Sequence, residues 1–248
     1  GPTARHEAYD LYKANRKATP DTLVPQIPYV KEVVRALSIP VIEMQGIEAD
    51  DIIGTLAMRY ASRDKKVVIV SGDKDLMQLV SHNVIMMDTM KEKTYDTAAV
   101  RERFGVGPEQ VPEILGLMGD SSDNIPGVPG IGAKGALALV EEFGSIEALI
   151  ENAEKIKNAK AKDAIKEFAD QARMSRDLAR IRTDVPVEFD LETSRHGEPD
   201  TEALIALFRE FEFSSLLQDL KMKDPATKMS SQTVIAEEDF QSLLQRLK

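Results

Sequence analysis

Seven carboxylates fall in three short groups whose spacing could hold metal ions. The first group opens a helical segment within GIEADD (46–51), and the second directly follows an apolar run within VSGDKD (70–75). The third lies within GDSSDN (119–124), where two aspartates stand three residues apart. The seven residues are Glu48, Asp50, Asp51, Asp73, Asp75, Asp120 and Asp123. If they meet in the fold, mutual repulsion would raise their pKa values steeply unless cations neutralise them.

Each acidic group also has a purely structural interpretation. Acids are favoured in the first turn of a helix, and aspartates after a strand or in a turn often form Asx turns. One shared site explains all three groups, whereas the structural interpretation needs three coincidences. The ligands are oxygen atoms and the chain has no cysteine, so the sequence predicts Mg²⁺ or Mn²⁺. Two such ions about 4 Å apart suit phosphodiester hydrolysis.

The third acidic group runs directly into a glycine-rich turn, NIPGVPGIGAKG (124–135). Glycines let the backbone approach a ligand, and successive N–H groups at the start of a helix can bind phosphate. Such a turn contacts the DNA backbone without reading the bases. A purely structural helix-to-helix hairpin is the alternative. The predicted phosphate-binding residues are Gly127, Gly130, Gly132 and Lys134.

The elements that position these groups change character along the chain. Apolar residues repeat at helical spacing over 30–37 and 52–60, while the β-branched run 67–70 is typical of a parallel strand buried on both faces. A second strand is predicted at 84–88, and from about residue 108 the apolar stripes are helical only. The prediction is an α/β fold with a mostly parallel sheet flanked by helices, followed by a helical region. Aspartates that follow the first of these strands would then lie at the carboxyl edge of the sheet, where ligands usually bind.

Composition limits the function classes. The 248 residues are 42% hydrophobic, which allows one large domain or two modest ones. No apolar run reaches the length of a membrane span, and the chain start does not resemble a signal peptide, so a cytoplasmic protein is expected. The formal charge of −10 argues against DNA binding only if the charge is evenly spread, and a carboxylate site accounts for much of it. The scattered histidines, His6, His82 and His196, are interpreted as surface or packing residues.

Four motifs together resemble one known family. YKANR (12–16), GIEADD, VSGDKDLMQL (70–79) and GDSSDNIPGVPGIGAK (119–134) occur in the order found in the 5′-nucleases of the flap endonuclease family, in the branch that bacterial DNA polymerase I carries. The similarity runs from Gly1 to about Leu220, and the last motif is highly specific. The resemblance implies a PIN-like 5′-nuclease fold that hydrolyses 5′ ends and flaps of DNA, including RNA-primer junctions, in replication and repair.

The resemblance also assigns roles to residues. The seven carboxylates would hold two metal ions directly or through water. Lys13 and Arg16, in a helical arch or clamp over the site, would steer the scissile phosphate, and Arg5 nearby would bind the DNA. The glycine turn would be a helix-three-turn-helix motif with a bound K⁺. The implied organisation is a nuclease core with the arch at 1–107, a helical DNA-binding region at 108–219, and a linker leading into a following polymerase domain at 220–248.

One departure from the family pattern leaves two hypotheses open. The family's first strand, which ends in a metal-binding aspartate, and a second aspartate would both precede Gly1, so they are absent from this sequence. The expected fold is therefore truncated at its N-terminus. The first hypothesis is a metal-dependent 5′ nuclease, and the second is a catalytically silent module that binds duplex DNA.

Overall fold

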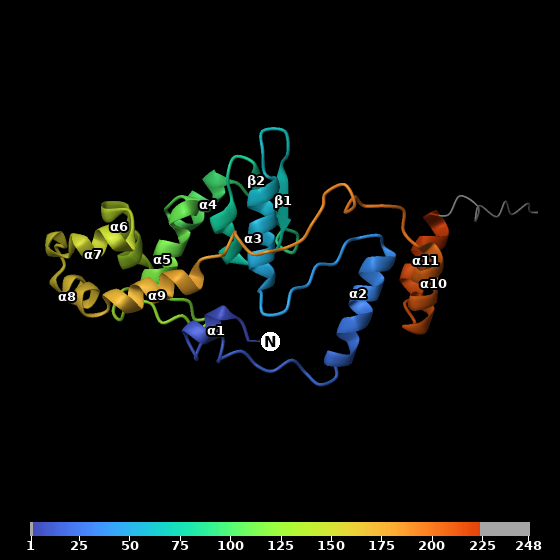
Figure 1. The fold of residues 1–248 in the computed structure, drawn as a ribbon, viewed down its shortest axis with the longest axis horizontal. Coiled ribbons are helices and arrows are strands. Elements are labelled where there is room, and N and C mark those ends of the chain that lie inside the picture. Colours follow the sequence, from blue (N-terminus) through green and yellow to red (C-terminus); the bar gives the residue numbers. More distant parts are fainter. Residues whose placement is uncertain (1, 224–248) are drawn as a thin grey trace, which may run out of the picture. The chain divides into compact units, whose positions relative to one another are not determined.

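The computed structural model describes residues 2–223, which pack as two units (Figure 1). The first unit contains residues 2–19 and 42–189, and the second contains residues 20–41 and 190–223. All seven carboxylates and the glycine-rich turn therefore belong to the first unit. Its short 3₁₀ turns are η2 (Lys74–Leu79), η3 (Pro108–Gln110) and η4 (Ala153–Lys155).

The first unit contains a three-stranded sheet in the order β1-β2-β3. Strands β1 (Val67–Val70) and β2 (Val84–Asp88) pair in parallel, and β3 (Lys93–Tyr95) pairs antiparallel to β2. Both predicted strands are confirmed, and one of the two strand pairings is parallel. Strand β3 was not predicted from the sequence, because only Tyr95 of its three residues is buried, which leaves no alternating pattern to detect.

The side chains of β1 alternate between core and surface. Ile69 is 4% exposed, whereas Val68 is 47% exposed and Val70 is 62% exposed. β1 is an edge strand of this sheet, and its second face carries the two valines into solvent. The expectation that this β-branched run is buried on both faces is therefore wrong.

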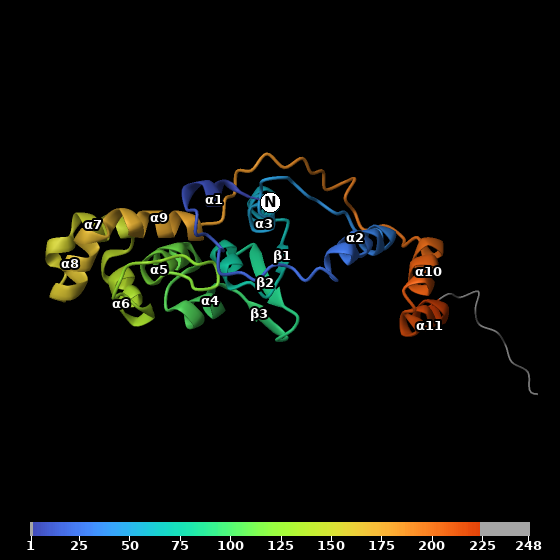
Figure 2. The same cartoon turned by 90° about the horizontal axis from the view of Figure 1, so that it is seen from below.

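Helices flank the sheet (Figure 2). Helix α1 (Ala4–Ala8) follows Thr3, and α3 (Ala49–Tyr60) begins at the predicted acidic motif and buries Ile52 and Ala57. Helix α4 (Thr97–Phe104) follows β3, with the Asp96 side chain accepting a hydrogen bond from the backbone N–H of Ala99 at its N-terminus. Helices α3 and α4 share a core with the sheet, through Ala57 and Val100, and the fully buried members of this core include Leu76 and Met86.

The rest of the first unit is helical, as the sequence predicts. Helices α5 (Val111–Met118), α6 (Ala133–Phe143), α7 (Ile146–Glu151), α8 (Ala159–Glu167) and α9 (Ala169–Ala179) surround a second apolar core. Gly116 allows α5 to pack closely on α9, because a Cβ there would lie 2.7 Å from the Cβ of Arg176. This packing places the end of α5, and hence Asp120, at a fixed position relative to the α9 segment.

The second unit is a small helical cluster. It contains η1 (Val24–Gln26), α2 (Ile27–Ala36), α10 (Thr201–Glu210) and α11 (Ser214–Lys223), around a core of Ala36, Leu204 and Phe208. The helix predicted at 30–37 is confirmed as α2. The domain boundaries given above stay a prediction, and the expected linker and following domain lie largely outside the described residues. Within residues 2–223, no helix is both long and apolar enough to cross a bilayer.

Candidate metal centre

The exit of β1 brings Asp73 and Asp75 to the carboxyl edge of the parallel strand pair. The Asp73 side chain accepts a hydrogen bond from the backbone N–H of Asp75 at 3.0 Å, which begins η2. The Oδ1 atom of Asp75 is buried and has no hydrogen-bond partner in the described residues. Burial, together with the charge of Asp73 and more weakly of Asp120 and Asp123, raises the pKa of Asp75 to about 7, against the opposing effect of Lys74. Asp75 therefore belongs to one electrostatic cluster with the third acidic group.

The start of α3 joins the same cluster. Burial raises the pKa of Asp50, and the nearby charge of Asp73 adds to this shift. Glu48 precedes the helix, and its Oε2 accepts hydrogen bonds from Lys13 Nζ at 2.5 Å and from Tyr12 Oη at 3.3 Å. Three segments far apart in sequence are thus joined by charge and hydrogen bonding, as the single-site hypothesis requires.

Basic side chains pair with both aspartates of the third group. Lys74 Nζ lies 2.7 Å from Oδ2 of Asp120, whose side chain is 3% exposed. Asp123 accepts from Arg16 at 2.6 Å and from the Tyr12 hydroxyl at 3.2 Å, and Lys13 Nζ lies 3.5 Å away. Lys13 and Arg16 lie in a segment of turns rather than in a helix, so the expectation of a helical arch around them is wrong for this structure.

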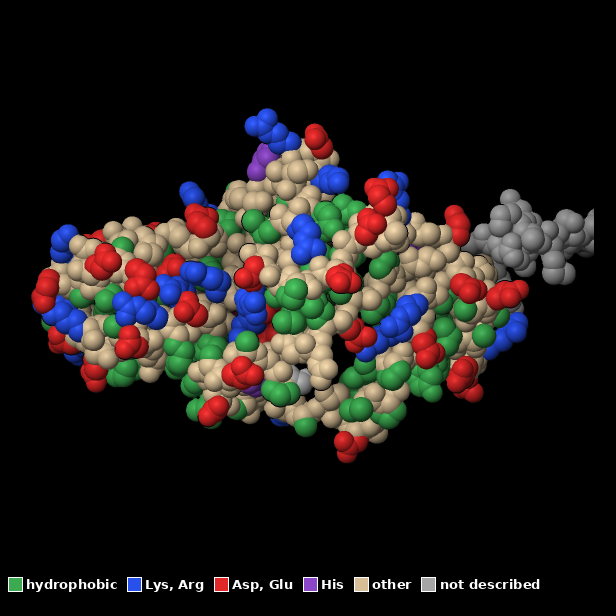
Figure 3. Space-filling view, in the orientation of Figure 1, with side chains coloured by type: hydrophobic (Ala, Val, Ile, Leu, Met, Phe, Trp, Pro, Cys, Tyr) green, Lys and Arg blue, Asp and Glu red, His purple; other side chains and the backbone are tan. Residues whose placement is uncertain are grey.

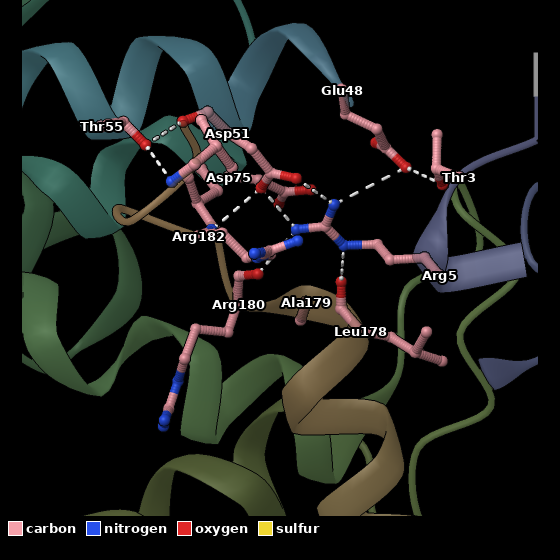
Figure 4. A network of polar contacts seen from close by, with 12 residues as sticks. Thr3, Arg5, Glu48, Asp51, Thr55, Asp75, Leu178, Ala179, Arg180 and Arg182 are labelled. Carbon is pink, nitrogen blue, oxygen red and sulfur yellow. Dashed lines mark hydrogen bonds and ion pairs between the residues drawn. The ribbon is translucent and has the colours of Figure 1, made fainter. Parts of the chain in front are cut away.

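Asp51 differs from the other carboxylates because it forms an internal clamp (Figure 4). Both of its oxygens accept from Arg5, each at 2.7 Å, and Oδ1 also accepts from the backbone N–H of Arg182. Arg5 further donates to the carbonyl oxygens of Leu178 and Arg180. The side chains of Arg5 and Asp51 are 11% and 4% exposed, so this pair ties α1 and α3 to the segment after α9.

Four of the predicted metal ligands border one small pocket. Its wall also includes Arg5 and Tyr12. The four carboxylates are Glu48, Asp50, Asp75 and Asp123. Among residues 2–223, however, no three Asp, Glu, His or Cys side chains are placed so that they could hold one ion. The physical reason is visible in the contacts, because basic side chains engage four of the seven carboxylates.

The donor chemistry nevertheless fits a hard divalent cation. Every candidate ligand is a carboxylate oxygen. Asp75 supplies an orphaned buried oxygen, and burial together with its acidic neighbours raises the pKa of its carboxyl group; a cation beside it would oppose that shift. Asp50, Asp73 and Asp75 could turn toward such an ion without releasing a basic partner, since none of their side chains has an ion-pair partner within residues 2–223, but as placed the three do not hold one ion together. Glu48, Asp120 and Asp123 would first have to exchange a basic partner for the ion.

Two site residues were missed by the sequence analysis. Tyr12 is 3% exposed, and its hydroxyl connects Glu48 with Asp123. Burial raises the pKa of Tyr12, and the charges of these two carboxylates raise it further. Lys74 pairs with Asp120 across 46 residues of sequence. Both residues lie inside quoted motifs, but only the folded chain shows which carboxylates they contact.

The glycine-rich turn divides into a buried part and an open part. Gly127 is buried against Met118 and Gly119, its N–H donates to Ser175 Oγ, and its carbonyl accepts from Gln171. Its positive φ of 64° and this close approach explain the glycine without a ligand. Gly130, Gly132 and Lys134 are exposed, and a Cβ at either of these two glycines would meet no atom within 4 Å. Phosphate contact therefore stays a prediction for these three residues and loses its support at Gly127.

Family models and relatives of known name match most of this chain. Residues 1–105 match a family model described as the 5′-3′ exonuclease N-terminal resolvase-like domain, and residues 106–202 match the 5′-3′ exonuclease C-terminal SAM fold. DNA polymerase I of Rhizobium leguminosarum is 46% identical over 86% of this chain and 21% of its own length. DNA polymerase I of Bacillus caldotenax is 44% identical over 91% of this chain and 26% of its own length. The chain thus spans about a quarter of the length of these relatives.

Solved structures give the same fold. A zinc-bound 5′-exonuclease of phage T5 has a TM-score of 0.64 at 21% identity, covering 89% of this chain and 80% of that one. The catalytic core of Rad2 in complex with DNA substrate has a TM-score of 0.55 at 18% identity, covering 89% of this chain and 75% of that one. The two family models together match residues 1–202, and the polymerase relatives align with 86% and 91% of this chain. The solved structures share its fold. This chain therefore belongs to the 5′-3′ exonuclease family.

Proposed function

We propose that this chain is a divalent-metal-dependent 5′ nuclease module that hydrolyses phosphodiesters at 5′ ends and flaps of DNA. The observation that carries the proposal is the cluster around Asp75, where a buried, unpartnered carboxylate oxygen lies among further carboxylates beside Lys13 and Arg16. By analogy with the polymerase relatives, the module would precede polymerase domains in a longer bacterial cytoplasmic protein. Its substrates would include nicks, flaps and RNA-primer junctions.

The metal ions we propose are two Mg²⁺ or Mn²⁺ ions. When bound, such a pair would activate the attacking water and stabilise the leaving oxygen. Asp50, Asp73 and Asp75 would hold the ions, together with Glu48, Asp120 and Asp123 once these have released their basic partners. Asp51 is satisfied by Arg5 and would act through the position of α3. A K⁺ ion at the exposed hairpin completes the set of proposed ions.

Lys13 and Arg16 would bind the scissile phosphate. Both now contact Asp123, so a phosphate that enters the site can exchange places with a carboxylate as their anionic partner. Arg16 is 55% exposed, whereas Lys13 is 16% exposed. We therefore assign initial capture of the phosphate to Arg16 and charge stabilisation inside the site to Lys13.

A catalytically silent module that binds duplex DNA is the second candidate. Four of the seven carboxylates are held by basic side chains, and no ready-made three-carboxylate site lies within the described residues; these two observations favour it. Cleavage of a 5′-labelled flap substrate in Mg²⁺ separates the candidates. The nuclease proposal predicts product from this chain and none from its Asp75→Asn variant. The same assay is repeated with a chain extended upstream of Gly1 by the family's first strand and its two aspartates. Binding without product in both chains would favour the silent module.

A further inference from the structure

A cleft in the first unit lies between the exposed hairpin and the segment that leads into α8. Its volume is about 410 Å³, and its walls come from two parts of the sequence, 129–142 and 156–164. Gly130, Gly135 and Ala138 line one wall, while Ala161 and Ala164 line the other. Ile131, Leu139 and Ile156 also line the cleft, but their side chains are buried. The small residues of both walls leave room for an extended backbone to approach.

Two lysines without ionic partners border this cleft. Lys157 and Lys160 are exposed, and within residues 2–223 neither forms an ion pair or a side-chain hydrogen bond. The other two lysines of α8, Lys162 and Lys166, both pair with Glu154. Lys160 within α8 and Lys157 just before it are therefore the unpaired lysines of this segment, and both border the cleft.

The charge around the cleft is local rather than a broad basic field. Figure 3 shows basic and acidic side chains intermixed over the end of the unit that carries α6–α8. Glu142 is the one carboxylate among the residues that line the cleft. Lys157 and Lys160 also line it. Among the residues next to the lining ones in sequence, three lysines stand against two acids: Lys134, Lys155 and Lys162 against Glu141 and Asp163. The local balance favours an anion that is narrow enough to follow the cleft.

We propose that this cleft is a second contact for the DNA backbone, in which Lys157 and Lys160 bind phosphates next to those bound by the hairpin. This inference rests on the proposed function because the partner is duplex DNA. The predicted phosphate-binding residues of the hairpin and the two lysines of the α8 segment would then form one continuous DNA-binding surface. The contact would be independent of base sequence, since the two lysines would bind phosphate oxygens, which carry no sequence information.

Salt dependence of duplex binding tests the proposal directly. The intact 248-residue chain would be titrated onto a labelled blunt duplex in EDTA, which prevents cleavage, and the apparent affinity measured by anisotropy at several salt concentrations. Each lysine–phosphate contact contributes about 0.9 to the slope of log affinity against log salt. A Lys157→Ala/Lys160→Ala variant should make that slope shallower by about 1.8 and weaken binding by roughly tenfold or more at low salt.

A matched control comes from the same helix. Lys162→Ala/Lys166→Ala removes the same charge from α8, but these lysines face Glu154, so the slope should stay as in the parent chain. Adding Lys134→Ala to the cleft variant should remove about 0.9 more, and Glu142→Gln should tighten binding. Circular dichroism verifies that each variant keeps its helical content.

The outcomes separate the two proposals. An equal change in slope for the cleft variant and the α8 control would show a general charge effect and overturn the second contact, while leaving the nuclease proposal intact. Unchanged binding by the cleft variant would do the same. If the parent chain fails to bind any duplex, both this inference and the DNA substrate of the proposed function are wrong.

Discussion

Arg5 and Asp51 form a two-pronged ion pair that ties α1 to α3, with Nη1–Oδ2 and Nη2–Oδ1 distances of 2.7 Å each. The pair is nearly buried, and Arg5 also donates to two carbonyl oxygens near the end of α9. The position of α3 fixes the directions of Glu48 and Asp50. Arg5 was expected to bind DNA, but its guanidinium N–H groups instead form the hydrogen bonds that hold the acidic cluster in place.

Replacement of Arg5 by alanine should be strongly destabilising. It would leave the Asp51 carboxylate buried, with only the Arg182 backbone N–H and no cation, a change that typically costs about 3–5 kcal/mol. Urea unfolding of the metal-free chain measures the loss. Arg182→Ala is the control, because the Arg182 side chain is 44% exposed and only its backbone contacts Asp51, so its effect should stay within about 0.5 kcal/mol. Equal effects of the two substitutions would contradict the clamp.

The Asp75 carboxyl should make the metal-free chain less stable as pH rises. Its pKa is about 7 in the folded chain and near the usual 3.8 when unfolded, so the folded state binds more protons between these values. The contribution of this carboxyl to the free energy of unfolding is then largest below about pH 4. It falls as pH rises towards 7, by at most about 4 kcal/mol. Asp75→Asn should flatten the curve in this window, measured by urea unfolding at each pH in EDTA. Asp163→Asn, at an exposed position, should leave the curve unchanged.

Tyr12 should act as a positioning residue for the carboxylates. Its single hydroxyl hydrogen is shared between Glu48 at 3.3 Å and Asp123 at 3.2 Å, and groups that orient ligands in this way typically contribute 10- to 100-fold to metal affinity. We expect Tyr12→Phe to weaken Mn²⁺ binding by roughly tenfold, measured by calorimetry without DNA. Tyr29→Phe removes a hydroxyl from the second unit and should change nothing. Unaltered Mn²⁺ affinity in Tyr12→Phe would remove Tyr12 from the site.

The local elements could be predicted from sequence because their signals are local. The β-branched run 67–70 and the apolar stripe that includes Leu139 depend on neighbouring residues, and β1 and α6 form where those patterns lie. The exposure of Val68 and Val70 was not predictable, since it depends on which strand ends the sheet. A short strand such as β3 carries too few buried residues to be detected.

The candidate site was predictable in composition but not in pairing. Carboxylate spacing identified the residues that gather near Asp75, yet nothing local shows that Lys74 reaches Asp120 or that Arg5 reaches Asp51, each 46 residues away. The same limit applies to Gly127 and Gly130, which look alike in the motif. One packs against Gly119 and the other is open to solvent, and only the position of α5 distinguishes them.

The division of labour between carboxylates and basic residues can be tested by kinetics. In the proposed nuclease, Lys13 stabilises charge on the phosphate, so Lys13→Ala should slow the chemical step by about 10²- to 10³-fold while Mn²⁺ still binds. Asp120→Asn/Asp123→Asn should instead abolish cleavage, and duplex binding should persist or tighten because negative charge facing the phosphates is removed. Single-turnover rates on saturating flap substrate, beside Mn²⁺ titrations, measure both effects. Because Lys13 now pairs with Glu48 at 2.5 Å, its loss also frees a carboxylate, which should favour rather than oppose metal binding. A Lys13 variant that loses its metal, or a double variant that cleaves at the parent rate, would show that these roles are assigned to the wrong residues.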